Sequence, residues 1–122
     1  MLTINKIFPQ EKIPEKTESF LFFDIETTGF SRDNTILYLI GCGYFAEEGF
    51  QFIQWFNDDG TSEEEILLAF QNILVKKDWQ LVTFNGNSFD IPYLKRHYDL
   101  NELTCDIEKY PSLDFYQFLK PF

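Results

Sequence analysis

Three apolar segments dominate the first half of the chain, at residues 19–25, 35–45 and 50–56. Each has the length and the aromatic or aliphatic content that favour a β-strand. Only short polar links separate them, which predicts an antiparallel meander. Gly41 and Gly43 interrupt the second segment and indicate either a bulge or a close backbone approach.

The second half of the chain alternates between helical and strand patterns. Ser62 and Glu65 have the spacing of a capping box, so we expect a helix to begin there. Apolar residues follow at helical spacing until Lys76 and Lys77, where the positive charges favour a helix end. The remaining predicted elements are a strand at 81–84, a helix from 89–97 with Pro92 in its first turn, and a last strand at 113–119. This order predicts an α/β domain with a mixed sheet.

Composition limits the domain count and the location. The chain has 122 residues, 44% of them hydrophobic and 19% aromatic, which is enough for one core. Residues 1–18 are polar and contain Pro9 and Pro14, so we expect an arm or edge extension without regular structure, followed by one domain over 19–122. Cys42 and Cys105 form no disulfide framework. No signal peptide or membrane span is evident, and we expect a cytoplasmic protein.

The net charge of −10 counts against a nucleic-acid partner, because proteins that bind phosphate backbones usually present a basic face. An acidic pocket can still meet phosphate through bound divalent cations. A basic surface could also lie on residues or partners outside this sequence.

Two carboxylates mark the end of the first predicted strand. Asp24 and Glu26 point to the same face because side chains alternate along a strand. Two acids beside an apolar core are costly unless donors or cations compensate them. Hard ions such as Mg²⁺ and Mn²⁺ prefer carboxylate oxygens, and a pair of such ions can hydrolyse a phosphodiester. The alternative is that both acids end the strand in solvent.

Asp90 follows the fourth predicted strand and begins the second predicted helix. The carboxyl end of that strand would bring Asp90 close to Asp24 and Glu26, which gives three converging carboxylates. The alternative is an ordinary helix N-cap.

Two strings resemble the motifs of a known family. The string Asp24-Ile25-Glu26-Thr27-Thr28-Gly29 resembles the first exonuclease motif of the DEDD superfamily, which has a ribonuclease-H-like fold. The string from Asn85 through Phe89-Asp90-Ile91-Pro92 resembles the second motif, as found in the proofreading domains of B-family DNA polymerases. Residues 36–41 and 81–94 are similar to the YprB-like branch of ribonuclease-H-like domains.

This resemblance implies a metal-dependent 3′–5′ exonuclease in which Asp24, Glu26 and Asp90 are the catalytic carboxylates that hold two Mg²⁺ or Mn²⁺ ions. It also implies that the 3′ end of a single-stranded nucleic acid is held by four residues that follow the motifs: Thr27, Thr28, Phe30 and Asn85. Phe30 could instead pack in the core, and Asn85 could be an ordinary turn residue.

The family pattern requires a fourth carboxylate on a later helix, preceded by His or Tyr. Asp114 lies four residues after Tyr110, but Pro111 disfavours a helix there, and Leu113-Asp114 is better placed on the strand before that helix. We expect His97 to be an exposed residue near a helix end and not a general base.

We therefore expect a ribonuclease-H-like domain that is truncated at its C-terminus, lacks its last helix and has three of four ligands. Alone it would be inactive or feeble, with a further domain or partner chain supplying the helix. The alternatives are a non-catalytic module that binds protein or nucleic acid, and an endonuclease or resolvase of the same superfamily. The D-x-E-T-T-G string argues against the latter.

Overall fold

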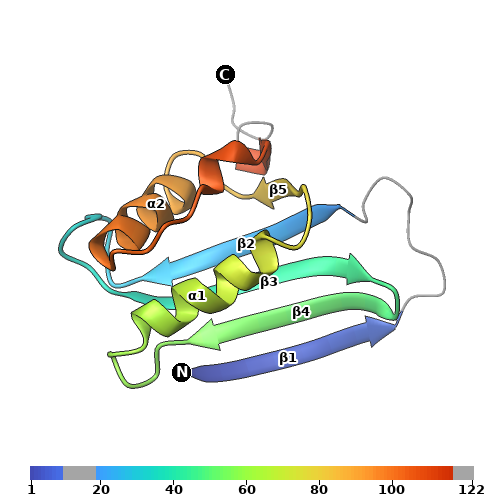
Figure 1. Cartoon of the computed structure of the whole chain (residues 1–122), viewed down its shortest axis with the longest axis horizontal. Coiled ribbons are helices and arrows are strands. Elements are labelled where there is room, and N and C mark those ends of the chain that lie inside the picture. Colours follow the sequence, from blue (N-terminus) through green and yellow to red (C-terminus); the bar gives the residue numbers. More distant parts are fainter. Residues whose placement is uncertain (10–18, 117–122) are drawn as a thin grey trace.

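The computed structural model describes residues 1–9 and 19–116. They form a six-stranded mixed sheet with two α-helices and a short 3-10 helix (Figure 1). The elements in chain order are β1 (Leu2–Pro9), β2 (Phe20–Thr27), β3 (Leu37–Ala46), β4 (Gly49–Phe56), α1 (Glu63–Leu74), β5 (Gln80–Thr83), α2 (Asp90–Leu100), η2 (Ile107–Lys109) and β6 (Ser112–Asp114).

The sheet has the strand order β1-β4-β3-β2-β5-β6. β2, β3 and β4 form the predicted antiparallel meander. β5 pairs parallel with β2, and β6 pairs parallel with β5, each after a helical crossover. The α/β class, the mixed sheet and the ribonuclease-H-like strand order are confirmed. The last predicted strand is shorter than expected, because a helical turn begins at Phe115, and residues 117–119 lie outside the described residues.

The N-terminal residues correct the prediction that the arm has no regular structure. Leu2–Pro9 is a strand that pairs antiparallel with β4 along its whole length. Its side chains are almost all exposed, so no regular alternation of buried and exposed positions marks it. The unpaired backbone of β4 explains the pairing, since a sheet edge offers hydrogen bonds to any chain that runs beside it. Residues 10–18 lie outside the described residues.

Both α-helices cover one face of the sheet, with α1 over β3 and β4 and α2 beside it (Figure 1). Helix α1 begins where predicted, but the capping box is wrong in its hydrogen bonds. The Ser62 hydroxyl donates to Asp59 Oδ1 at 2.6 Å and makes no capping bond. The helix ends at Leu74, before the two lysines. In the described part of the chain, no helix is long and apolar enough to cross a membrane.

The opposite face of the sheet carries no helix in the described ranges, and we call it the open face. Its centre is a row of small and aromatic residues, with Gly43 paired between Phe22 on β2 and Phe52 on β4. A close approach does occur at Gly43, but to a side chain and not to backbone, since a Cβ would lie 2.4 Å from the Phe50 ring. No bulge lies at the glycines; the register shift lies between Glu26 and Thr27, which pair with Leu39 and Leu37 and leave Tyr38 of β3 without a partner in β2.

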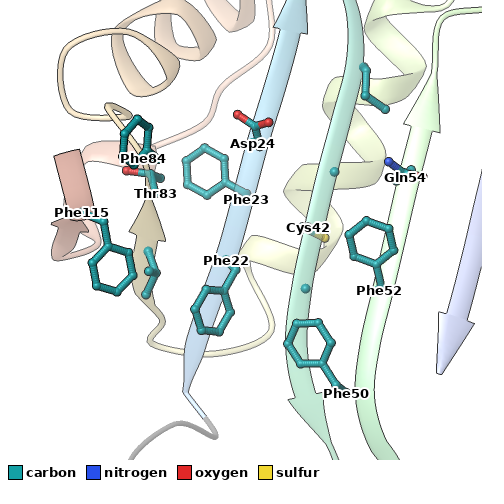
Figure 2. Close-up of a pocket in the computed structure, with 14 residues that line it drawn as sticks. Phe22, Phe23, Asp24, Cys42, Phe50, Phe52, Gln54, Thr83, Phe84 and Phe115 are labelled. Carbon is teal, nitrogen blue, oxygen red and sulfur yellow. The ribbon is translucent and has the colours of Figure 1, made fainter. Parts of the chain in front are cut away.

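A hollow of about 640 Å³ lies on the open face (Figure 2). Its lining is mostly aromatic and includes Phe22, Phe50, Phe52, Phe84 and Phe115. Asp24 lines the same hollow from β2, next to the apolar rings (Figure 2).

Candidate active site

β2 places the first two carboxylates as its alternation predicts. Phe23 and Ile25 are buried in the core, whereas Asp24 and Glu26 are exposed on the other face. Asp24 lies opposite Gly41 of β3, so no side chain from that strand covers it. The position of both acids on one face of β2 is confirmed.

Asp90 is the first residue of α2, and only 4% of its surface is exposed. The pairing of β2 with β5 ends at Phe22 and Val82, which leaves the later backbone groups of β2 on this side without a strand partner. The Asp90 carboxyl takes that place, because Ile25 N donates to Asp90 Oδ2 at 3.3 Å. It makes no side-chain capping bond in α2, so the N-cap alternative is wrong.

The electrostatics show that Asp24 and Asp90 lie close together. Burial, as the largest cause, and the negative charges of Asp24, Asp114 and Glu26 together raise the pKa of Asp90 to about 7, against a lowering by the Ile25 hydrogen bond. Partial burial also raises the pKa of Asp24, although hydrogen bonds with the Ile25 backbone and with Asp90 partly lower it. The surroundings therefore favour the protonated form of each of these two carboxyl groups more than water does.

The donor chemistry of this pair fits Mg²⁺ or Mn²⁺, since both ions prefer hard carboxylate oxygens. A cation between Asp24 and Asp90 would relieve the repulsion that raises the pKa of Asp90. Within residues 1–9 and 19–116, however, no three His, Cys, Asp or Glu side chains are gathered closely enough to hold a metal ion. The structure thus brings Asp24 and Asp90 together, and Glu26 stands beside them without completing a cluster.

Asp114 accepts hydrogen bonds from several backbone groups, which the sequence did not reveal. It is 3% exposed on β6, and its carboxylate accepts from Asn85 N at 2.6 Å, Asn87 N at 3.1 Å and Tyr116 N at 3.0 Å. These bonds fasten the β5–α2 loop, which leads into Asp90. Tyr110 is buried, and its hydroxyl donates to Leu74 O at 2.8 Å, so it belongs to the core.

The β5–α2 loop depends on two special backbone positions. Asn85 has φ 64°, and its carbonyl accepts from Phe89 N at 3.1 Å, so the turn alternative for this residue is confirmed. Gly86 donates to Thr83 Oγ1 at 3.1 Å, and a Cβ there would lie 2.3 Å from that oxygen.

The other three residues predicted to hold substrate lie at the end of β2 and on the loop that follows it. Thr27 Oγ1 donates to Gly29 O at 2.6 Å, and Thr28 Oγ1 accepts from Ile36 N at 2.9 Å, so both hydroxyls shape this loop. Phe30 is 91% exposed and stands edge-on to Phe89, with ring centroids 6.1 Å apart. The alternative of core packing for Phe30 is therefore wrong.

The exposed position predicted for His97 is also wrong. Its side chain is 2% exposed and lies between Glu63 of α1 and Arg32 of the loop after β2. The helical pattern around residue 97 gives no sign of this, because the two partners are 34 and 65 residues away in the sequence.

Comparison with known proteins agrees with this fold. A family model described as the RNase H superfamily matches residues 21–121. A DNA polymerase from Pyrococcus glycovorans is 35% identical over 86 residues, which cover 61% of this chain and 11% of the polymerase. A solved structure, the family B DNA polymerase from the hyperthermophilic archaeon Pyrobaculum calidifontis, matches with a TM-score of 0.66 at 15% identity, over 84% of this chain and 16% of the polymerase.

The chain therefore spans only a small share of these relatives' length, and at 15% identity the structural likeness shows the fold alone. The resemblance to B-family DNA polymerases read from the second motif is confirmed, and the YprB-like branch stays a prediction. Since the family model covers most of its length, the chain belongs to the RNase H superfamily.

Proposed function

We propose that this domain carries the active site of a metal-dependent 3′–5′ exonuclease that hydrolyses phosphodiester bonds of nucleic acid. The observation that supports this most is the pairing of Asp24 with the buried Asp90. Their mutual repulsion contributes to a pKa of about 7 for Asp90, and perturbed carboxyl pairs of this kind are frequent at catalytic sites. The proposal includes a cytoplasmic location, which rests on the sequence alone.

Asp24 and Asp90 would hold the first divalent ion, Mg²⁺ or Mn²⁺, and Glu26 is proposed as the further ligand for a pair of ions. When bound, such ions supply an activated water and neutralise the charge that develops on the phosphate. The Ile25 N–H donates to one Asp90 oxygen and so orients this carboxyl group toward β2.

The substrate that fits best is a single strand with a free 3′ end. Phe30 lies on the loop that follows β2, and its ring is almost fully exposed. Exposed aromatic rings stack readily on unpaired bases. Thr27 and Thr28 are proposed to act through the backbone that they shape around the terminal nucleotide, because their hydroxyls already serve the loop. Asn85 is proposed to hold the terminal nucleotide as well, from a loop position that its backbone N–H and carbonyl fix.

A nuclease assay tests the proposal. The purified chain is incubated with Mn²⁺ and with DNA or RNA oligonucleotides labelled at the 5′ end, and products are followed over time. We expect slow shortening from the 3′ end that Asp24→Asn abolishes. Asp78→Asn, a matched change at an exposed aspartate outside the site, should leave the rate unchanged. Equal rates in both variants would show that the cleavage comes from a contaminant.

We also propose that a helix outside this sequence, from a further domain or a partner chain, covers the open face. The aromatic hollow beside Asp24 supports this, because monomeric proteins seldom leave large apolar patches in water. A longer chain that contains the helix should be much more active than these 122 residues. Brisk turnover by the present chain alone would contradict the proposed dependence on that helix.

A non-catalytic module is the second candidate. It is favoured by the lack of a three-residue metal cluster among the described residues and by the net charge of −10. Binding of single-stranded oligonucleotides without any cleavage, by both the present and the extended chain, would support this candidate over the exonuclease.

A further inference from the structure

Helix α2 holds the loop at residues 28–36 with three side chains from one face. Tyr93, Arg96 and His97 lie at positions i, i+3 and i+4, which project together from a helix. The contacts are Tyr93 OH to Thr35 Oγ1 at 2.9 Å, Arg96 Nε to Asp33 Oδ1 at 2.6 Å and His97 Nε2 to Arg32 O at 2.7 Å. The same loop carries the exposed Phe30 ring.

The His97 contact differs from the other two because the imidazole is buried and both ring nitrogens are engaged. Nδ1 lies 2.8 Å from Glu63 Oε1, and Nε2 lies 2.7 Å from Arg32 O. The Tyr93 ring stacks on the imidazole with centroids 4.0 Å apart and planes within 11°. Arg96, in contrast, makes its ion pair with Asp33 at the exposed surface, where such pairs contribute little.

Both partners of His97 can only accept a hydrogen bond. Burial alone would raise the pKa of Glu63, but hydrogen bonds from His97, Asn101 and the Leu37 backbone lower it, so Glu63 is a carboxylate at neutral pH. The Arg32 carbonyl has no proton to give. A neutral imidazole has one N–H and would leave one short contact between two acceptors, whereas an imidazolium satisfies both.

We propose that His97, as an imidazolium, is a positioning residue that fixes the 28–36 loop, and with it Phe30, relative to the Asp24–Asp90 pair. The inference rests on the proposed exonuclease function. His97 lies two helical turns after Asp90 on α2, and Glu63 also accepts from Leu37 N at 3.0 Å, where the loop enters β3. The contact of the buried His97 with the partly buried Glu63 thus joins the loop, the start of β3, α1 and α2.

Hydrogen exchange tests whether His97 fixes the loop. In His97→Gln, the Thr28 and Leu37 amides, which bond to Ile36 O and to Glu63, should exchange roughly tenfold to a hundredfold faster, as expected for loss of hydrogen bonds to charged groups. Tyr98→Phe is the matched control. It removes a buried hydrogen bond from the same helix, Tyr98 OH to Leu67 O at 2.7 Å, without touching the loop. Equal acceleration in both variants would overturn the proposal.

Because His97 is the only histidine, its ring nitrogens can be followed by NMR without ambiguity. We expect two ring N–H signals at neutral pH in the full chain. In Glu63→Gln, a shape-conserving variant that serves if His97→Gln does not fold, the second ring proton should be lost more readily. A single neutral tautomer in the unaltered chain would overturn the proposal.

Substrate measurements separate this inference from the proposed function. With the longest active chain, His97→Gln should raise KM for a single-stranded oligonucleotide about tenfold, with a smaller change in kcat. The reason is that the substitution frees the 28–36 loop and leaves the Asp24–Asp90 pair in place. Tyr98→Phe should leave KM unchanged. A fall in kcat alone would contradict the positioning role. If no chain cleaves nucleic acid, the proposed function fails, while exchange and NMR still decide whether His97 fixes the loop.

Discussion

Replacing Asp90 with Asn should stabilise the domain at neutral and alkaline pH while removing its activity. Asn keeps the shape of Asp, its amide oxygen can accept from Ile25 N, and its amide protons can donate to Asp24. It carries no negative charge in a place where burial and three carboxylates oppose one. Catalytic sites commonly trade stability for function in this way.

The magnitude follows from the pKa of Asp90, which is about 7 in the folded state against 3.8 for the ordinary carboxyl. Each unit corresponds to about 1.4 kcal/mol, so ionising Asp90 in the fold costs on the order of 4 kcal/mol. Since the folded pKa is raised, the folded state binds more protons than the unfolded state between these two values. Stability is therefore fully present below pH 4, falls as the pH rises to 7 and levels off above it.

Urea unfolding of both proteins from about pH 4 to pH 8 measures this difference. Asp90→Asn should approach the unaltered chain at the acid end of this range and match it below about pH 3, where Asp90 is mostly protonated in both states, and exceed it by a few kcal/mol near pH 8. Saturating Mn²⁺ should shrink the gap, because only the unaltered chain gains from the ion. A variant that is less stable at pH 8 would refute the reasoning on Asp90.

Three other changes give independent tests. Asp114→Ala leaves three backbone N–H groups without their acceptor, two in the β5–α2 loop and one at Tyr116, and should cost about 3 kcal/mol in urea unfolding. A loss below about 1 kcal/mol would mean that the loop holds itself. Gly86→Ala places a methyl group against Thr83 and should cost about 1–3 kcal/mol, seen as a lower Tm. Phe30→Ala should leave Tm unchanged, because the ring is exposed. The same variant should weaken single-strand binding by about 1–3 kcal/mol in fluorescence anisotropy, and unchanged binding would exclude stacking on Phe30.

Local patterns were sufficient to predict most of the sheet and the two acids of β2. The alternation from Leu21 to Glu26 determines both the strand and the face of each side chain, because the two-residue period is a property of the strand itself. The position of Asp90 at the start of α2 was equally accessible, since a buried strand, a turn and a helical pattern occur in order around it.

The residues that the sequence did not reveal act through partners far away in the chain. β1 is recognisable only from the free edge of β4, and its side chains carry no periodic signal. The role of His97 requires Glu63 and Arg32, and that of Asp114 requires Asn85 and Asn87. Neither spacing corresponds to a helix or strand period, so only the tertiary structure brings these groups together.

The capping box failed for a related reason. Ser62 and Glu65 have the correct spacing, but Asp59 lies in the preceding turn and accepts the Ser62 hydroxyl, whose oxygen also accepts from the N-terminal amine at 3.0 Å. The Ser62 hydroxyl thus bonds to Asp59 and to the first residue of the chain, and these two contacts compete with the capping bond that the spacing predicts.

The central claim is that Asp24 and Asp90 hold a divalent ion. A crystal of the chain soaked in Mn²⁺ at about pH 8, where Asp90 is ionised, and measured for anomalous scattering tests it most directly. We predict anomalous density between the Asp24 and Asp90 carboxylates, with Glu26 as a further ligand when a second ion binds. An empty site at saturating Mn²⁺, with the two carboxyl groups still in direct hydrogen-bond contact, would contradict the claim and favour the non-catalytic module.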